Sequence, residues 1–415
     1  MRAIAWTVFA AALLAAGCSG AEERGSTRAK GPAGASTSSE TVAATTTAAP
    51  APIPPTGSEP ERIPRGRFTI TPRRSLPQRE RLPTFRAVKV ADANYPAGLA
   101  AAPDGRILYS ELWGGRIRVI RRDGTVDPEP WADVNRRFGI RWTQLFHGGL
   151  SGIAFDPEYD RNRHVYVVTQ VPHRRTGFAR RSLVVRYTEV NGRGRRPRVI
   201  LDLPASKFDN TYSLVFGPDG MLYVPTGFLG TRRPRNADPL ADLRGKILRV
   251  TRAGKAPGDN PYDERAPRVW ATGFKNTFDL AFFPGRDYAV GGDNGTVDHD
   301  EINLLMAGHD YGYPAHEGLT TRRRLTPPLL DFVSDAPAPV GILYYSRRRH
   351  PALRGRFLLC NNDGGMVALR LRPSDPGRLL RLTPVVEGCT LDLVQTPDGS
   401  VVFGDAGSIY RLVQG

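Results

Sequence analysis

The stretch Leu214-Val215-Phe216-Gly217-Pro218-Asp219-Gly220-Met221-Leu222-Tyr223-Val224 places two apolar runs on either side of a Pro-Asp-Gly turn. Glycine after aspartate supplies the positive φ angle of a tight hairpin, and the aromatic and β-branched flanks suit pleated strands. Related units begin near residues 98, 153, 280, 341 and 391. Six copies, roughly 45–70 residues apart, are typical of blades arranged around an axis. The sequence therefore predicts an all-β fold, a six-bladed β-propeller of four-stranded antiparallel blades, with its ligand site where loops converge at one end of the axis.

The composition limits the class of protein. Of 415 residues, 40% are apolar and 24% charged, which is too apolar for a disordered chain and too polar for a polytopic membrane protein. The net charge is +17, and 52 of the 58 basic residues are arginine. These arginines are scattered and accompany no nucleic-acid-binding motif, so we expect no nucleic-acid partner. Attraction to anionic polysaccharides or lipid head groups is compatible with this charge.

The N-terminus is typical of an exported protein. One arginine precedes an apolar run over residues 3–16, and Gly17-Cys18 follows. Cys18 makes this segment resemble a bacterial lipoprotein signal, in which the cysteine becomes the new N-terminus and carries the lipid. An ordinary secretory signal, cut nearby, is the alternative. We expect a signal peptide over residues 1–18 and an extracytoplasmic lipoprotein anchored to a membrane of the bacterial cell envelope.

Residues 19–85 are rich in Ala, Ser, Thr, Pro and Arg and lack the bulky apolar residues that could offset the entropy of ordering, so they predict a disordered tether. The propeller is expected over residues 86–415. Outside the cytoplasm Cys360 and Cys389 can form a disulfide. Two free thiols are equally compatible with the sequence.

Five phrases in the propeller region resemble the glucose/sorbosone dehydrogenase family. The family consists of six-bladed propellers that use pyrroloquinoline quinone (PQQ) and calcium to oxidise sugars. The phrases occupy residues 148–157, 243–249, 257–261, 270–276 and 300–314. Their order and spacing follow the family over about residues 94–414.

The resemblance implies a catalytic pair. In the family, an inner-loop histidine removes the hydroxyl proton of the sugar, a role that suits a group with a pKa near the working pH. Alignment on residues 214–220 puts Asp209 at that position, and a carboxylate there needs a raised pKa to act as a base. His147 occupies a neighbouring position that is usually glutamine. We expect His147 to face the cavity, although a loop histidine bonded to backbone is the alternative.

The residues that would bind the quinone match less well. PQQ carries three carboxylates, which the family meets with arginine and lysine. Lys275 stands where the family usually has arginine, Asp363 falls on a later lysine, and Cys389 and Leu391 replace two arginines of the last blade. The resemblance implies PQQ as the cofactor, but the sequence lacks most of the cations that would bind its carboxylates. The candidate cofactor residues are Lys275, Asn276, Asn210 and Asp363.

A calcium site is the other cofactor that the resemblance implies. Residues 293–301 contain four carboxylates, and hard cations prefer carboxylate and carbonyl oxygens. The implied metal residues are Gly295 and Thr296 through their carbonyls, Asp300, Glu301 and the nearby Tyr311. A solvated acidic turn, partly paired with arginine, is the alternative.

Three functions remain open on the sequence. The first is an exported, lipid-anchored, PQQ-dependent dehydrogenase that oxidises the CH–OH group of a small-molecule sugar or alcohol and passes electrons to an acceptor. The second is a non-redox propeller that binds carbohydrate or cell-wall material and has lost the quinone. The third is a calcium-dependent, lactonase-like hydrolase, which rests on analogy between folds.

Overall fold

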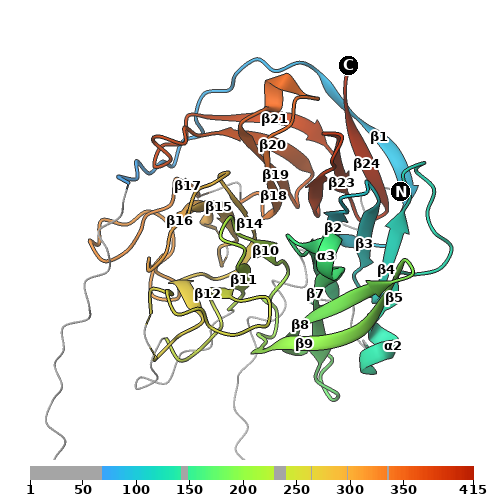
Figure 1. Ribbon diagram of the computed structural model, residues 1–415. Helices are drawn as coiled ribbons and strands as arrows, with labels where there is room; N and C mark the ends of the chain where they lie inside the picture. The colour runs from blue at the N-terminus through green and yellow to red at the C-terminus, as the bar shows by residue number, and fades with distance from the viewer. Residues whose placement is uncertain (1–67, 142–147, 229–239, 263, 297, 334–335) are drawn as a thin grey trace, which may run out of the picture. The chain divides into compact units, whose positions relative to one another are not determined.

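The computed structural model describes residues 68–141, 148–228, 240–262, 264–296, 298–333 and 336–415. These residues form six four-stranded antiparallel sheets, labelled in Figure 1, and very little helix. Five of the sheets follow the chain from their inner to their outer strand, and the sixth takes its outer strand from the N-terminal end of the propeller. Inner strands of neighbouring sheets contact each other around most of the ring. The predicted six-bladed propeller is confirmed.

The first three blades lie in the N-terminal half of the propeller. Blade 1 contains β2 (Pro96–Ala101), β3 (Ile107–Glu111), β4 (Arg116–Ile120) and β5 (Ala132–Asp133). Blade 2 contains β6 (Leu150–Phe155), β7 (His164–Pro172), β8 (Ala179–Val190) and β9 (Arg193–Pro204). Blade 3 contains β10 (Val215–Phe216), β11 (Leu222–Thr226), β12 (Lys246–Val250) and β13 (Val269–Thr272).

The other three blades complete the ring. Blade 4 contains β14 (Thr277–Phe282), β15 (Ala289–Asp293), β16 (Asp300–Leu305) and β17 (Leu330–Phe332). Blade 5 contains β18 (Pro339–Tyr345), β19 (Arg356–Asn361), β20 (Gly365–Arg370) and β21 (Arg381–Glu387). Blade 6 contains β22 (Leu393–Gln395), β23 (Val401–Gly404), β24 (Ser408–Gln414) and β1 (Phe85–Asp92). The described helical turns are α2 (Val134–Phe138), α3 (Tyr159–Asn162) and η1 (Pro351–Leu353), and none of them has the length and apolar character of a membrane span.

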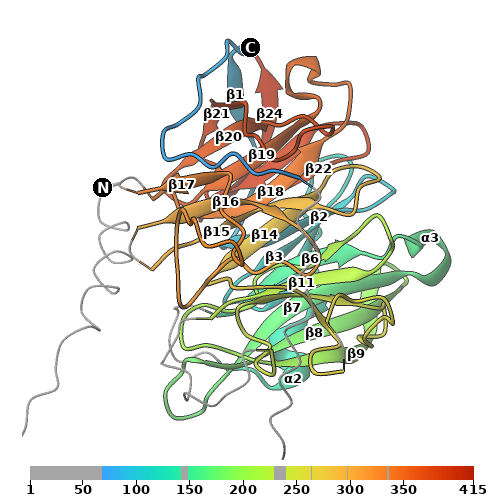
Figure 2. The ribbon, with the colours of Figure 1, turned by 90° about the vertical axis from the view of Figure 1, so that its left-hand side faces the viewer.

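The two ends of the propeller chain meet in blade 6. β1 pairs antiparallel with β24, with Phe85 opposite Gln414 and Asp92 opposite Ser408. This pairing covers the edge of β24 with β1, which lies beside it in Figure 1 and Figure 2, and closes the ring by joining both ends of the chain in one sheet.

The repeated turns form for local reasons. In blade 3, Gly220 has φ 73°, and the carboxylate of Asp219 accepts the N–H of Met221 at 3.1 Å. Val224 and Leu248, on neighbouring strands of the same blade, are fully buried. The core therefore lies between the faces of adjacent sheets, where apolar side chains leave water.

Residues 68–84, which the sequence analysis assigns to the tether, lie against the propeller, and we call them the strap. The ring of Phe68 packs on Tyr288 with 4.9 Å between centroids, and Thr71 donates its N–H to the carbonyl of Gly377 at 2.8 Å. In Figure 1 the strap, in blue, passes along blade 5 outside β21 before it becomes β1. Its apolar and hydrogen-bonding contacts explain why this arginine-rich segment is ordered.

Candidate functional site

The topology brings the described candidate residues to one face of the propeller. Asp209 lies on the link from β9 to β10, and Lys275 on the link from β13 to β14. Residues 294–296 and 298–299 lie between β15 and β16, and Asp363 lies on the turn between β19 and β20. Because neighbouring strands run antiparallel, links between blades and turns between second and third strands emerge at the same end of the sheets. We call this end the link face. His147 and Cys18 lie outside the described residues.

Asp209 and Lys275 form a buried ion pair. Nζ of Lys275 lies 3.3 Å from Oδ2 of Asp209, and the two side chains are 10% and 11% exposed. Two consecutive residues after β11 hold the two links together, because Gly227 donates its N–H to the carbonyl of Asn210 at 3.0 Å and Phe228 donates to the carbonyl of Lys275 at 2.6 Å. A Cβ on Gly227 would lie 2.5 Å from the backbone nitrogen of Asn210, so this close approach requires glycine. The candidate base and the candidate cofactor cation are thus direct neighbours.

Asp293, at the end of β15, fixes the backbone beside this ion pair. Its carboxylate accepts the N–H of Lys275 at 3.0 Å, the N–H of Asn276 at 2.8 Å and the hydroxyl of Thr277 at 2.9 Å. Burial raises the pKa of Asp293 to about 6, although these hydrogen bonds oppose the shift. Asp293 therefore sets the path of the link that carries Lys275.

The acidic segment 293–301 stabilises loops through its side chains. Asp300 accepts the N–H of Gly295 at 2.8 Å and that of Ala338 at 2.6 Å. Glu301 accepts the N–H of Gly318 at 2.7 Å, and burial holds the pKa of Glu301 well above its usual range. Within the described ranges, no three His, Cys, Asp or Glu side chains converge as a metal-ligand set. A calcium site at this turn, through the carbonyls of Gly295 and Thr296, stays a prediction.

The other two residues of the implied calcium region have structural partners. Tyr311 donates its hydroxyl to the carbonyl of Leu304 at 2.5 Å and stacks on Phe274 with 4.7 Å between centroids. Thr296 donates both its N–H and its hydroxyl to Glu317, at 3.0 and 2.9 Å. The sequence analysis missed Glu317, because it lies on the long connection between β16 and β17 and carries no motif.

Several buried oxygen atoms near the link face have no hydrogen-bond partner within the described part of the chain. They belong to the side chains of Asp209, Asn276, Asn294 and Asn361, and Oδ2 of Asp209 has only its ion pair with Lys275. Acceptor oxygens without a hydrogen-bond donor suit two kinds of ligand. The hydroxyl groups of a polyol can donate hydrogen bonds to them, and a hard cation can be coordinated by them.

A disulfide occupies the region where the resemblance implies a cofactor arginine. Cys360, on β19, is bonded to Cys389, on the link from β21 to β22, with 5.1 Å between their Cα atoms. This resolves the two alternatives of the sequence in favour of the disulfide. Asp363, two residues beyond the end of β19, is exposed, and burial of part of its carboxyl raises its pKa.

Two half-buried acids, Asp279 on the inner strand β14 and Asp392 directly before the inner strand β22, were not singled out by the sequence analysis. Asp392 accepts the N–H of Leu99 at 2.6 Å, and Asp279 accepts the N–H of Ile342 at 3.1 Å, so each carboxyl joins two neighbouring blades. Burial raises the pKa of Asp279 to about 6, and burial together with the charge of Asp279 raises that of Asp392 to about 8. Asp279 and Asp392 precede the same apolar position of their inner strands as Gly341 does in blade 5, so an alignment of the six inner strands could have found them. The position is crowded, because a Cβ on Gly341 would lie 2.7 Å from Oδ1 of Asp392.

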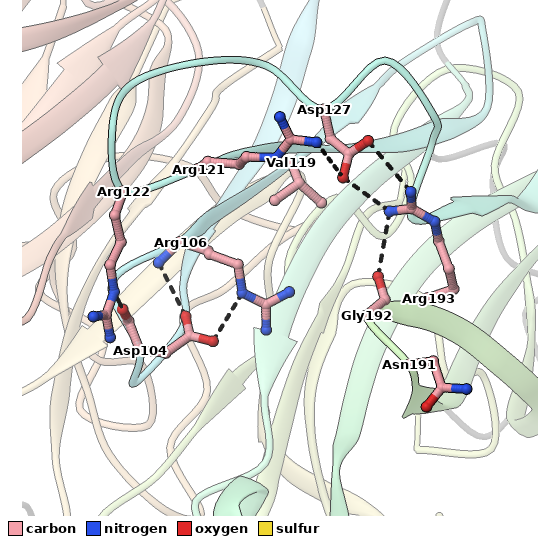
Figure 3. Close-up of a pocket in the computed structure, with 9 residues that line it drawn as sticks. All are labelled: Asp104, Arg106, Val119, Arg121, Arg122, Asp127, Asn191, Gly192 and Arg193. Atoms are coloured by element: carbon pink, nitrogen blue, oxygen red, sulfur yellow. Dashed lines mark hydrogen bonds and ion pairs between the residues drawn. The ribbon is translucent and has the colours of Figure 1, made fainter.

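A groove of about 610 Å³ lies away from the link face, at turns of blades 1 and 2 (Figure 3). Both of its aspartates are paired with arginines. Asp127 forms ion pairs with Arg193 at 3.1 Å and with Arg121 at 3.3 Å. Arg106 forms an ion pair with Asp104 at 2.8 Å. This groove is a charge network that connects two blades, and none of the predicted site residues lies in it.

Comparison with known proteins identifies the family. A family model described as Glucose / Sorbosone dehydrogenase matches residues 93–411. The uncharacterised protein slr1608 of Synechocystis sp. is 30% identical over 367 residues, which cover 80% of this chain and 87% of that protein. Quinoprotein glucose dehydrogenase B of Acinetobacter calcoaceticus is 26% identical over 257 residues, 55% of this chain and 52% of that protein.

A solved structure from Thermus thermophilus, described as an oxidoreductase (glucose dehydrogenase), has a TM-score of 0.67 and 29% identity to this chain. The match covers 79% of this chain and 100% of that one. The family match reaches into all six blades, and the candidate residues described above lie within it. This chain belongs to the glucose/sorbosone dehydrogenase family, an oxidoreductase family of six-bladed propellers.

Proposed function

We propose that this chain is a sugar dehydrogenase-type oxidoreductase that acts on a CH–OH group of a neutral sugar at the link face. The observation that carries the proposal is the Asp209–Lys275 pair, 3.3 Å apart, because it joins the two positions at which the resemblance places the base and a cofactor cation. The unpartnered acceptor oxygens of Asn276, Asn294 and Asn361 support a polyol as the ligand.

Asp209 is the proposed proton acceptor. Oxidation of a secondary alcohol to a carbonyl removes the hydroxyl proton and a carbon-bound hydrogen with its electron pair. Oδ2 of Asp209 is a buried oxygen with no hydrogen bond, so a sugar hydroxyl can donate to it and then transfer its proton. The Lys275 ammonium compensates the negative charge of Asp209 when the site is empty.

PQQ, bound as the resemblance implies, does not fit the described residues. Lys275 is already paired with Asp209, Asp363 brings a negative charge in place of a positive one, and Cys389 is committed to the disulfide. A ligand with three carboxylates would meet the charges of Asp209 and Asp363 with little compensation. No step of the proposal passes through PQQ, and the site suits a two-electron acceptor that carries fewer negative charges.

Calcium is the proposed metal, held by the backbone carbonyls of Gly295 and Thr296 with water. The turn is preformed, because Asp300 accepts the N–H of Gly295 and Glu317 accepts that of Thr296. A carbonyl site of this kind matches the oxygen preference of calcium. There the ion would bind and orient sugar hydroxyl groups.

We further propose that the protein works outside the cytoplasm and is attached to a membrane by a lipid on Cys18. The apolar segment 3–16 and the disulfide Cys360–Cys389 both support an exported chain. Mass spectrometry of the mature N-terminal peptide tests the lipid, because a diacylated Cys18 has a characteristic mass and an unmodified terminus would contradict the anchor.

The decisive experiment measures dye reduction by purified protein with a panel of aldoses and calcium, with PQQ or an uncharged quinone as electron acceptor. We expect sugar-dependent turnover with the uncharged quinone or dye, and a loss of at least about 100-fold in kcat for Asp209→Asn. Asp375→Asn, a change to an exposed aspartate between β20 and β21, is the matched control and leaves turnover unchanged. The absence of turnover with every acceptor would overturn the dehydrogenase.

A non-redox sugar-binding propeller is the second candidate, and the neutralised Lys275 favours it, because no other cation is placed beside Asp209 in the described part of the chain. Calorimetric titration with the same sugars separates the two candidates. Binding without turnover would establish the second candidate, and hydrolysis of aldonolactones without dye reduction would establish the lactonase-like alternative.

A further inference from the structure

Half of the protein's net positive charge is concentrated on one blade and the segment that crosses it. The strap (68–84) and blade 5 with its turns (339–388) contain thirteen arginines and four acidic residues, a balance of nine out of the net charge of +17. We call this region the basic edge. The arginines are Arg73, Arg74, Arg79, Arg81, Arg347, Arg348, Arg349, Arg354, Arg356, Arg370, Arg372, Arg378 and Arg381.

The basic edge is assembled by the fold from two segments that lie far apart in the sequence. The carbonyl of Gly377 on blade 5 accepts the N–H of Thr71, and Thr383 accepts that of Glu80 at 3.1 Å. Glu80 also pairs with two arginines of blade 5, Arg356 and Arg370. Ten of the thirteen arginines are exposed, so this one glutamate compensates little of the charge.

Two of the four acidic residues of the basic edge lie at or beside the link face, whereas Glu80 lies on the strap and Asp375 on the turn between β20 and β21. Asp363 is on a turn at the link face, and Glu387 ends β21 beside the next link. The exposed run Arg347–Arg349 lies at the opposite end of the sheet, between β18 and β19. Positive charge therefore dominates the outer side of blade 5 and the end away from the site.

Arg347, Arg348, Arg349 and Arg354 line a groove of about 630 Å³ together with Asp398. Asp398 pairs with Arg349 at 3.1 Å and is the single acid among the lining residues. The groove in Figure 3 is also lined by four arginines, but by two aspartates, each of them paired with arginine, so its excess of positive charge is smaller by one. A net field remains at the blade 5 groove and is available to an external anion.

We propose that the basic edge docks on an anionic membrane surface. The described structure begins at Phe68, within the strap, so a lipid anchor on Cys18 would be joined to the propeller at the basic edge itself. The arginines are spread over the strap, the outer side of blade 5 and its turn, which suits a planar array of lipid phosphates better than one compact anion. Docking through this region leaves the link face open to small solutes.

The test measures, by sedimentation, binding to vesicles that mix phosphatidylcholine with the anionic lipid phosphatidylglycerol. The protein is the chain from Ser58, which holds all six blades in one compact unit and lacks Cys18, so that only the surface is tested. One variant carries Arg347→Ser, Arg348→Ser and Arg349→Ser. The control carries Arg195→Ser, Arg196→Ser and Arg198→Ser, which removes three exposed arginines of blade 2 on the opposite side of the ring.

We expect the unaltered chain to bind the anionic vesicles at low salt and not to bind vesicles of pure phosphatidylcholine. The blade 5 variant loses at least about tenfold in affinity, because each arginine near an anionic surface contributes several-fold, whereas the blade 2 control loses less than about threefold. Near-ultraviolet circular dichroism checks that both variants remain folded. Equal losses in the two variants, or no vesicle binding but tight binding to soluble polyphosphate, would overturn the membrane assignment. Vesicle binding is independent of turnover, so this test and that of the proposed function can fail separately.

Discussion

Nζ of Lys275 lies 3.3 Å from Oδ2 of Asp209, although the two residues belong to links of different blades. The pair explains how a propeller of this family accommodates a carboxylate in place of a histidine and still buries a lysine beside it. Neither charge would be tolerated there alone, because a buried ion without a partner is strongly unfavourable. The burial of each of these charges therefore depends on the presence of the other.

Breaking this ion pair should destabilise the fold. Lys275→Met leaves the Asp209 carboxylate buried without a counter-ion, and we expect the free energy of unfolding to fall by about 3–5 kcal/mol. Asp209→Asn combined with Lys275→Met should cost clearly less than the two single changes added together. Urea unfolding of the four proteins measures the difference.

A surface pair provides the control for that cycle. Arg181 and Asp202 are 44% and 47% exposed, so their alanine variants should show a coupling of at most about 1 kcal/mol. A coupling energy between Asp209 and Lys275 no larger than that of the surface pair would contradict the dependence of the two buried charges.

The disulfide Cys360–Cys389 should stabilise the junction between blades 5 and 6. It closes a loop with a sequence separation of 29, and we expect the double variant Cys360→Ser, Cys389→Ser to lose about 2–4 kcal/mol of unfolding free energy. Reductant should lower the Tm of the unaltered protein and leave that of the double variant unchanged. If reductant leaves the Tm of the unaltered protein unchanged, the stabilising contribution of the disulfide is refuted.

Stability should fall as the pH rises from about 5 to about 8. Burial raises the pKa of Asp279 to about 6 and that of Asp392 to about 8, and the charge of Asp279 adds to the second shift. The folded state keeps these protons after the unfolded chain, with carboxyl pKa values near 4, has lost them. The stabilising contribution is thus complete below about pH 4 and is lost as the pH rises through the folded pKa values.

Asp279→Asn isolates this effect, because it removes one raised carboxyl and the repulsion that acts on Asp392. The slope of the unfolding free energy between pH 5 and pH 8 should become shallower, whereas the exposed Asp375→Asn should leave it unchanged. Urea unfolding at several pH values measures both slopes, and identical slopes in the two variants would exclude the buried pair as their origin.

Restoring positive charge at the link face should increase quinone binding. Asp363→Lys with Asp209→His replaces two carboxylates and releases Lys275 from its ion pair, so we expect affinity for PQQ with calcium to rise at least about tenfold. Absorbance titration measures it. Asp375→Lys with Asp209→His makes the same change of charge on a loop between β20 and β21, and an equal gain there would mean that net charge alone acts.

The sequence by itself determined the six-bladed ring. The Pro-Asp-Gly turns and the apolar runs that flank them depend on interactions between residues close in the sequence, so each blade can be predicted from its own segment. The hydrogen bond from the N–H of Met221 to the carboxylate of Asp219 is one such local interaction. The order of the family phrases then placed Asp209 and Lys275 on links that converge. The strap was not foreseen, because its anchoring ring, Phe68, packs on a blade that follows much later in the chain.

Only the tertiary structure decided what these residues do to one another. It paired Asp209 with Lys275, bonded Cys360 to Cys389, turned the carboxylate of Asp293 onto the backbone of Lys275, and joined the strap to blade 5 as one basic surface. Each of these contacts joins segments that only the closed ring brings together, and its energy depends on burial and on distances of a few ångströms. The sequence pattern contains neither the burial of a charge nor its distance from a partner. The propeller could therefore be predicted blade by blade, whereas its charge pairing could not.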